Sequence, residues 1–244
     1  MKNILITGSS RGIGLDIALG LLNEGNNIVI NGRNKKKLEK LKKKNKLLNY
    51  VVGDFSLEKQ SKIAVKKAIK ILGKIDILIC NIGQSKSCLP NNENLSEWKK
   101  IFNQNFFTAT NAIENCKNQL IKNQGKIICI SSAAGNKFIE GAPITYSTAK
   151  SALNFYGKSL SFYLGKRGVT LNIIAPGNTL FKGSTWEKKI KADPIKIKKL
   201  IKKTVPLNNF ATPQDISNLV KFLISDQARF INGAVFTIDG GQTI

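Results

Sequence analysis

Short apolar runs alternate along the chain with longer segments in which apolar residues recur every three or four positions. Seven of the runs are rich in Ile, Val and Leu, a composition typical of strands buried on both faces. These predicted strands cover residues 3–7, 27–31, 47–54, 74–81, 125–132, 169–176 and 234–239. The longer segments predict helices with one apolar face. These predicted helices cover residues 13–25, 35–44, 57–72, 95–122, 145–166, 185–203 and 213–225.

The strict alternation of the two patterns predicts an α/β fold. In such a fold a parallel, doubly wound sheet, here of about seven strands, carries helices on both faces. A chain of 244 residues suits one large α/β domain or two small ones. Since no repeat, linker or low-complexity segment divides the chain, we expect a single domain over residues 1–244.

The sequence carries no recognisable targeting or membrane segment. The apolar run "ILI" ahead of Thr7 is too short for a signal peptide. No segment approaches the roughly 18–20 apolar residues of a membrane-spanning helix. The four cysteines, at 80, 88, 116 and 129, form no CxxC pair and no metal-ligand spacing. We therefore expect reduced thiols, a cytoplasmic location and no membrane partner.

Histidine is absent from the chain. This excludes a Ser-His-Asp triad, a Cys-His pair and any histidine-ligated metal, and we expect no metal site. Proton transfer must therefore use Tyr, Lys, Asp, Glu, Cys or water.

The net charge is +24 at neutral pH, which is extreme for a chain of this length. Such a charge is typical either of a protein with an anionic partner or of general over-use of lysine. The lysines spread over the whole chain, with clusters at 35–46 and 188–203, and no aromatic residues are interleaved as a single-strand binder would need. The second interpretation is favoured, and we expect no specific nucleic-acid partner.

The stretch "TGSSRGIG" at 7–14 joins the first predicted strand to the first predicted helix. Its glycines, at positions 8, 12 and 14, permit a tight turn and close approach to the backbone. The N-terminus of the following helix supplies unpaired N–H groups that bind phosphate. In this context the glycine pattern predicts a dinucleotide site.

Two arginines bear on the choice of dinucleotide. The second predicted strand ends in "NGRN", where a protein that binds a free ribose 2′-hydroxyl usually has an acidic residue. Arg33 stands there instead, and Arg11 lies inside the glycine stretch. Guanidinium groups bind phosphate strongly, so the sequence favours NADP(H) over NAD(H).

Tyr146 and Lys150 stand four residues apart in "ITYSTAKS" and share one face if that segment is helical. Such a pair is typical of a catalytic phenol with an ammonium neighbour. In a chain this rich in lysine the spacing also arises by chance, and the spacing alone leaves both interpretations open.

Taken in order, these motifs resemble the classical short-chain dehydrogenase/reductase family over essentially the full chain. The matching residues are Thr7, Gly8, Gly12, Ile13, Gly14, Asp54, Asn81, Gly83, Asn105, Ser132, Tyr146, Lys150, Pro176 and Gly177, with the closing stretch 237–243. The resemblance implies a Rossmann-type sheet and an oxidoreductase that interconverts a ketone and a secondary alcohol by hydride transfer with NADP(H).

The resemblance also implies a role for each matching residue. Tyr146 is expected to be the acid/base, with its pKa lowered by Lys150, while Ser132 binds the substrate oxygen and Asn105 holds a water that relays the proton. The expected cofactor-binding residues are Gly8, Ser10, Arg11, Gly12, Ile13, Gly14, Arg33, Asp54, Phe55, Asn81, Gly83, Tyr146, Lys150, Pro176, Gly177 and Thr179.

The chain departs from the family pattern after its sixth strand. The family commonly has a threonine at the position of Phe181, where its hydroxyl helps to hold the carboxamide of the nicotinamide. Either Thr179 takes over this role or the backbone holds the carboxamide. The variable segment 181–204 that follows is expected to cover the substrate, with Trp186 and Phe181 as candidates for an apolar or sugar-stacking wall. The segment is equally compatible with a solvated basic helix that has one aromatic residue packed beneath it.

The resemblance leaves the substrate open. The general pattern is similar to 3-oxoacyl-carrier-protein reductases, in which basic residues near the entrance, here Lys122 and Arg167, would meet an acidic carrier. The alternative is a dehydrogenase or reductase of a sugar in surface-glycan biosynthesis, because "PGN…TWEKK" resembles a branch of the family with that role. A more distant alternative is a dinucleotide-binding regulator without catalysis. The family usually forms homotetramers or homodimers, and we expect the same here.

Overall fold

Seven parallel strands form one sheet, in the order β3-β2-β1-β4-β5-β6-β7, in the computed structural model, which describes residues 1–244. The strands are β1 (Asn3–Ile6), β2 (Asn27–Gly32), β3 (Asn49–Val52), β4 (Ile77–Cys80), β5 (Lys126–Ile130), β6 (Thr170–Pro176) and β7 (Val235–Ile238). Strand order reverses between β1 and β4, which makes the sheet doubly wound. The predicted fold class is confirmed, including its seven strands.

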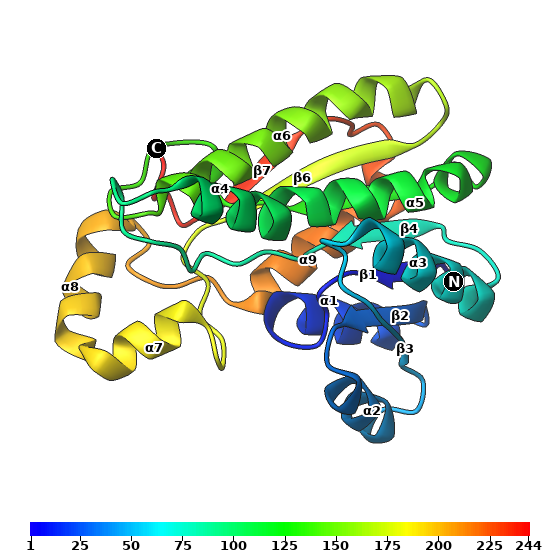
Figure 1. Cartoon of the computed structure of the whole chain (residues 1–244), viewed down its shortest axis with the longest axis horizontal. Helices are drawn as coiled ribbons and strands as arrows, with labels where there is room; N and C mark the ends of the chain where they lie inside the picture. Colours follow the sequence, from blue (N-terminus) through cyan, green and yellow to red (C-terminus); the bar gives the residue numbers. More distant parts are fainter.

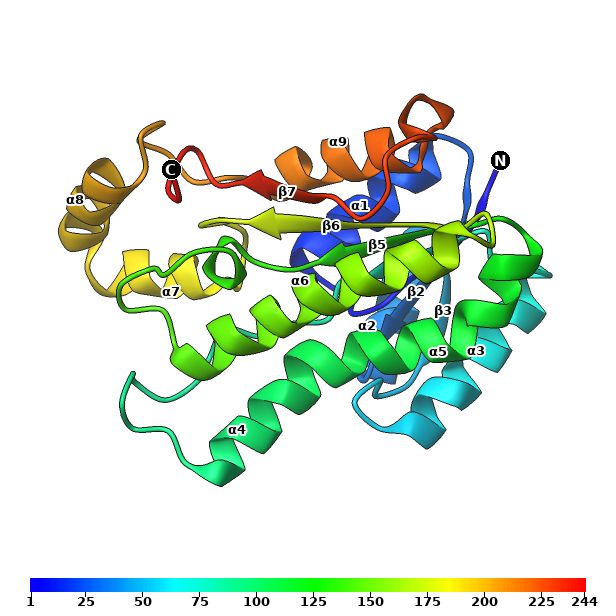
Figure 2. The same cartoon turned by 90° about the horizontal axis from the view of Figure 1, so that it is seen from above.

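Helices cover both faces of this sheet (Figures 1 and 2). They are α1 (Gly12–Asn23), α2 (Lys35–Lys44), α3 (Glu58–Leu72), α4 (Leu95–Phe102), α5 (Thr108–Lys122), α6 (Ile144–Gly165), α7 (Thr185–Ala192), α8 (Pro194–Thr204) and α9 (Pro213–Ile224). Neighbouring residues of one strand face opposite sides, so Leu5 packs against α3 and α5 while Ile4 and Ile6 pack against α1 and α9. The continuous apolar runs thus build two cores. No helix combines the length and the apolar character needed to cross a membrane.

The helix predicted over 95–122 is interrupted in the structure. A π-helical turn, Asn103–Phe107, separates α4 from α5. Asn105 lies inside this turn and is fully buried. Its carboxamide donates to the carbonyl of Ile101, four residues earlier, at 3.0 Å and also bonds Gln84 in a distant loop. The turn therefore serves to aim one polar side chain at the end of the sheet.

The helix predicted over 185–203 is two helices, α7 and α8, which meet at Asp193 and Pro194. Proline has no N–H to donate and is suited to the first turn of a helix. Asp193 caps that new helix by accepting a hydrogen bond from the N–H of Lys196 at 2.9 Å. The chain therefore ends one helix and starts the next at this point.

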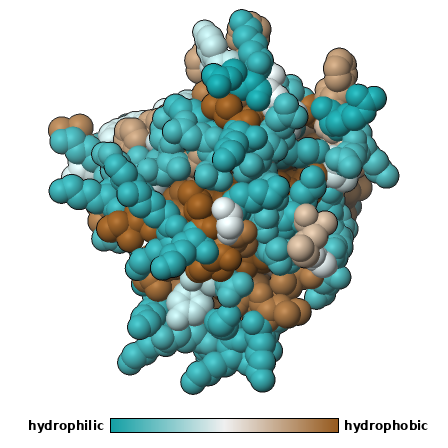
Figure 3. Space-filling model, turned by 90° about the vertical axis from the view of Figure 1, so that its right-hand side faces the viewer, coloured by the Kyte–Doolittle hydropathy of each residue, from teal (hydrophilic) through white to brown (hydrophobic).

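Residues 181–210, called the flap below, contain α7 and α8 and form a small body of their own. Ile197, Ile201 and Val205 are buried together, with Trp186 and Phe210 packed against them, apart from the two main cores. The flap projects beyond the carboxyl ends of the strands (Figures 1 and 2). The far end of the molecule, at the amino ends of the strands, is mostly hydrophilic on its surface (Figure 3).

Candidate active site

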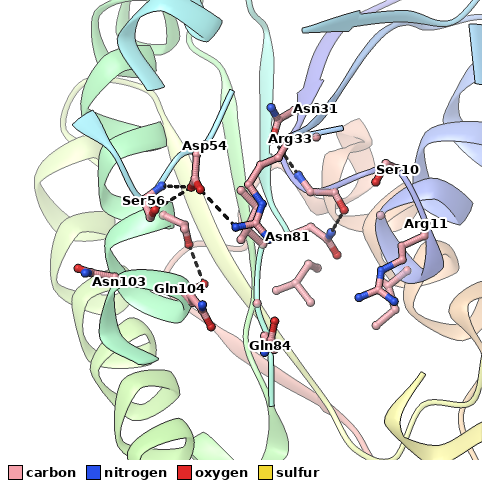
Figure 4. A pocket seen from close by; sticks show the side chains of 18 of the residues that line it. Ser10, Arg11, Asn31, Arg33, Asp54, Ser56, Asn81, Gln84, Asn103 and Gln104 are labelled. Atoms are coloured by element: carbon pink, nitrogen blue, oxygen red, sulfur yellow. Dashed lines mark hydrogen bonds and ion pairs between the residues drawn. The ribbon is translucent and has the colours of Figure 1, made fainter. Parts of the chain in front are cut away.

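A cavity of about 570 Å³ opens at the carboxyl ends of the central strands. Its walls come from the loop after β1, the ends of β2 to β5, the start of α6 and the first residue of the flap (Figure 4). This is the position at which open α/β sheets bind their ligands, beside the point where strand order reverses. The volume lies in the range of cofactor and substrate sites.

The glycine loop is shaped for an anion. Gly8 and Gly12 have φ of +61° and +55°, a left-handed conformation that favours glycine. No side chain caps the N-terminus of α1 and its first turn has no acidic residue, so the helix end keeps its N–H groups and positive dipole for a ligand. A dinucleotide pyrophosphate fits this donor set.

Asn81 holds the glycine loop against the end of β4. Its side-chain nitrogen donates to the carbonyls of Thr7 at 3.2 Å and Gly8 at 3.0 Å, and its own N–H donates to the Thr7 hydroxyl at 3.0 Å. A Cβ at Gly14 would collide with this carboxamide. Gly14 is thus needed for the loop to close on Asn81.

The end of β2 carries cations and no carboxylate of its own. Arg33 is largely exposed and its guanidinium lies 3.3 Å from the Asp54 carboxylate, toward which it points in Figure 4. Burial raises the pKa of Asp54, but hydrogen bonds from Ser56 and Arg33 outweigh it and leave the pKa below its usual range. Lys37, in the first turn of α2, has a lowered pKa because of burial and the nearby charge of Arg11.

Besides lining the cavity near the end of β2, Arg11 contacts the flap. Its guanidinium donates to the carbonyl of Gly183, in the flap, at 3.2 Å. Exposed hydrogen bonds and ion pairs of this kind contribute little to stability, so a phosphate can displace the present partners of both Arg11 and Arg33.

Tyr146 and Lys150 lie one turn apart near the start of α6, and both line the cavity. Lys150 is only 2% exposed and its ammonium donates to the carbonyl of Ile130, at the end of β5, at 3.0 Å. Ser131 fixes the same helix to the sheet, because its hydroxyl donates to the carbonyl of Lys150 at 3.3 Å. The pair is therefore anchored to the strand that carries Ser132.

The environment perturbs both titratable groups. Burial raises the pKa of Tyr146, while hydrogen bonding to Ser132 acts in the opposite direction. Burial lowers the pKa of Lys150 to about 8, against the opposing effects of Cys129 and Cys80. Burial therefore dominates the pKa of Tyr146, and the Lys150 ammonium is directed at Ile130. The lowering expected from Lys150 together with the cationic nicotinamide of the oxidised cofactor stays a prediction.

Ser132 and Asn105, the other two predicted catalytic residues, are not among the residues that line the cavity, although Ser131 and Gln104 beside them are. Ser132 follows β5 and its hydroxyl accepts a hydrogen bond from the N–H of Ala134 at 3.3 Å, which fixes a short 3-10 turn. Asn105 accepts from the N–H of Gln84 at 2.8 Å and donates to its carbonyl at 3.1 Å. These two hydrogen bonds hold the backbone of Gly83 beside Lys150. A Cβ added to Gly83 would lie 2.9 Å from the Lys150 ammonium.

Some predicted residues lie outside the cavity. Phe55, in the turn that follows β3, is fully buried and packs in the same core as residues of α3 and α5. Thr179 is 7% exposed and its hydroxyl turns back to the carbonyl of Gly177 at 3.2 Å. The flap residue that does line the cavity is Phe181. Trp186 packs on Phe210 with ring centroids 5.4 Å apart, so its ring serves the flap core instead of a sugar-stacking wall.

The two basic residues expected at the entrance are also elsewhere. Lys122 ends α5 and Arg167 follows the end of α6, whereas Tyr146 is at the start of α6. A helix of 22 residues rises by about 33 Å, so these cations lie at the other end of the domain from the cavity.

Several residues that line the cavity were not predicted from the sequence: Asn31, Gly32, Ser56, Gln84, Lys100, Asn103, Gln104 and Ser131. One of them had a usable signal. Asn31 is a polar residue in an otherwise apolar strand, and its carboxamide accepts from the N–H of Gly8 at 3.2 Å and donates to the carbonyl of Gly53 at 3.1 Å. From its place in β2 it joins the loops that follow β1 and β3.

Comparison with known proteins agrees with this geometry. The chain matches the family described as "Enoyl-(Acyl carrier protein) reductase" over residues 8–243. It is similar to the 3-oxoacyl-[acyl-carrier-protein] reductase FabG of Rickettsia conorii, with 34% identity over 248 residues that cover 99% of this chain and 96% of the relative.

Two solved structures extend the likeness to three dimensions. One is an oxidoreductase of the short-chain dehydrogenase/reductase family from Burkholderia thailandensis, with TM-score 0.89, 28% identity and coverage of 99% of this chain and 92% of that one. The other is the RhlG/NADP active-site complex from Pseudomonas aeruginosa, with TM-score 0.89, 25% identity and coverage of 99% and 96%.

Proposed function

Because the chain belongs to the short-chain dehydrogenase/reductase family of oxidoreductases, we propose that it reduces a ketone to a secondary alcohol with NADPH. The observation that carries the proposal is a single cavity lined both by the glycine loop and by Tyr146 and Lys150. A dinucleotide held at the N-terminus of α1 extends along the carboxyl ends of the strands toward these two side chains.

When bound, NADPH supplies the hydride to the carbonyl carbon of the substrate. Tyr146 then gives its proton to the substrate oxygen, and the raised pKa keeps this phenol protonated and ready to donate. Ser132 donates a hydrogen bond to the same oxygen. Lys150, with a pKa of about 8, is charged at neutral pH and stabilises the phenolate that remains.

Asn105 supports the return of the proton. Both hydrogens of its carboxamide are used by Ile101 and Gln84, and its oxygen accepts from Gln84. An amide oxygen has two lone pairs, so one is free to hold a water beside Lys150. We assign Asn105 this water and the relay from solvent to Tyr146.

The preference for NADP(H) over NAD(H) rests on the cations at the end of β2. Arg11 and Arg33 line the cavity together with Ser10 and Gly32, and the Asp54 carboxylate that also lines it is ion-paired with Arg33. Lys37, in the first turn of α2, is close enough to Arg11 for the two charges to interact. A ribose 2′-phosphate would find charge-assisted donors here. The NADP complex of RhlG supports the same choice.

For the substrate we favour a 3-oxoacyl group on an acidic carrier. The 3-oxoacyl-[acyl-carrier-protein] reductases among the relatives support this class. The packed ring of Trp186 argues against a sugar-stacking role for that residue, while the "PGN…TWEKK" pattern keeps a sugar reductase as the alternative. Of the segment 181–204 that is expected to cover the substrate, Phe181 lines the cavity.

We propose a homotetramer or homodimer, as the family usually forms. Helix α6 exposes Phe155, Phe162 and Tyr163 to 74%, 60% and 67%, an apolar surface that a second copy would cover. A cytoplasmic location agrees with four free cysteines.

The test is turnover of acetoacetyl-CoA and of acetoacetyl-carrier by the purified protein with NADPH, against a panel of keto-sugars. We expect acyl substrates to be reduced, and Tyr146→Phe to lower kcat by at least about a hundredfold with NADPH binding intact. Reduction of keto-sugars alone would replace the acyl substrate by a sugar. If the wild-type protein binds NADPH but reduces no substrate of either kind, the result would favour the alternative of a dinucleotide-binding regulator without catalysis.

A further inference from the structure

The ring of Phe181 lies directly over the glycine loop. A Cβ placed on Gly12 would meet three atoms of this ring at 2.5, 2.8 and 2.9 Å. The same ring lines the cavity. It therefore occupies space next to the N-terminus of α1, where the loop would receive a pyrophosphate.

A polar contact lies two residues further along the flap. The Arg11 guanidinium donates to the carbonyl of Gly183 at 3.2 Å. Arg11 immediately precedes Gly12, so both contacts join the start of the flap to the same turn of the glycine loop. The two contacts, Phe181 on Gly12 and Arg11 on Gly183, are called the clasp below.

The start of the flap is internally stiff. The Ser184 hydroxyl accepts from the N–H of Phe181 at 3.4 Å and of Glu187 at 3.0 Å. The Glu187 carboxylate in turn accepts from the N–H of Gly183 at 2.6 Å. Residues 181–187 are thus tied to one another and to α7, and the clasp holds or releases them as a unit.

The flap is joined to the domain through a neck at its two chain ends, and the N–H of Leu207 adds a hydrogen bond to the carbonyl of Gly240, after β7, at 3.1 Å. The N–H of Leu180 donates to the carbonyl of Ala211 at 2.8 Å, and the N–H of Ala211 donates to the carbonyl of Asn178 at 2.9 Å. With its own small core beyond this neck, the flap can move as one body. The clasp is the contact that fixes its inner edge to the cofactor loop.

We propose that the clasp and a bound dinucleotide exclude each other, so that NADPH binding releases the flap. This rests on the proposed function. The clasp and the dinucleotide need the same space over Gly12 and the same Arg11 guanidinium. A phosphate would win the guanidinium, because it is a stronger acceptor than the exposed carbonyl of Gly183. The coupling is reciprocal: a change that weakens the clasp tightens dinucleotide binding by up to the same factor.

The departure of this chain from the family pattern, Phe181 in place of threonine, thereby acquires a role: the aromatic ring closes the cofactor site until the cofactor displaces it.

The first measurement is the NADPH dissociation constant, by nicotinamide fluorescence, for Phe181→Ala and Phe181→Leu. We expect Phe181→Ala to bind roughly fivefold more tightly or better, at the lower end of typical coupling between sites, with Phe181→Leu between it and the wild type. Phe138→Ala, at an aromatic residue that is 89% exposed on another segment, should leave the constant unchanged. Weaker binding by Phe181→Ala would make the ring a cofactor contact and overturn the proposal.

The second measurement reads the clasp directly. Lys182 stands between its two contacts, so trypsin cleavage of the Lys182–Gly183 bond, followed by mass spectrometry, reports its release. We expect slow cleavage in the wild type, faster cleavage with NADPH, and fast cleavage in Phe181→Ala with or without NADPH. Cleavage after Lys188 and Lys198, inside α7 and α8, corrects for general unfolding.

Protection of the Lys182–Gly183 bond by NADPH in the wild type would overturn the proposal. Absence of NADPH binding in the wild type and in every variant would refute the proposed function and the competition with it. NADPH binding that Phe181→Ala weakens would refute the competition alone and leave the proposed function standing.

Discussion

Replacing Lys150 by methionine tests whether its charge is buried in the folded protein. The ammonium is 2% exposed and its polar partner in the structure is the carbonyl of Ile130. Methionine keeps most of the apolar stem and removes the charge. We expect Lys150→Met to abolish reduction and to change how the free energy of unfolding depends on pH.

The magnitude follows from the lowered pKa. Below about pH 8 Lys150 is charged in both the folded and the unfolded chain, and burial of the charge has a constant cost. Between about 8 and the ordinary value of 10.5 the folded chain has lost this proton while the unfolded chain keeps it, so stability rises with pH in this window. At about 1.4 kcal/mol per pH unit, the whole window corresponds to about 3 kcal/mol.

The assay is urea unfolding of the wild type and Lys150→Met at several pH values between 7 and 10. The difference in unfolding free energy, wild type minus variant, should increase by about 2 kcal/mol over this range. Loss of the bond to Ile130 lowers the stability of the variant at every pH and does not alter the slope. A difference that stays flat with pH would show that Lys150 keeps its ordinary pKa in the fold.

Two further changes test the dinucleotide site. Gly14→Ala would press on the Asn81 carboxamide, so we expect NADPH binding to be lost and thermal unfolding to show a stability loss of about 1–3 kcal/mol. The control is Gly20→Ala on the same helix, whose Cβ meets only side-chain ends and should cost little stability. Lys37→Gln should weaken NADPH about tenfold and leave NADH unchanged in fluorescence titrations, with exposed Lys36→Gln as the control. An unchanged NADPH-to-NADH ratio would remove Lys37 from the 2′-phosphate site.

The sheet could be predicted because its chemistry is local. Strands buried on both faces leave continuous apolar runs, and each of the seven runs became a strand. The break between α7 and α8 also had a local signal in Asp193 and Pro194, although the lysine-rich pattern ran through it. The polar stretch "NQNFF" at 103–107 is compatible with a break in the helix, but it does not specify a π-helical turn, in which Asn105 bonds a partner, Gln84, in another loop.

The sequence predicted which residues form the site better than it predicted which groups those residues contact. Motif spacing brought Tyr146, Lys150 and the glycine loop to one cavity. It assigned Phe55 to the cofactor by its place beside Asp54, although its side chain is buried in the core. Which group each arginine contacts depends on segments far apart in the sequence, such as Arg11 with Gly183.

The two pKa changes at the active site bear on the proposed acid/base step. A raised pKa keeps the Tyr146 phenol protonated, which is the form that would donate to a ketone oxygen. Lys150, at about 8, still carries its charge at neutral pH and would stabilise the phenolate once the proton has left. In the proposed mechanism the buried pair therefore holds its proton before hydride transfer and tolerates its loss afterwards.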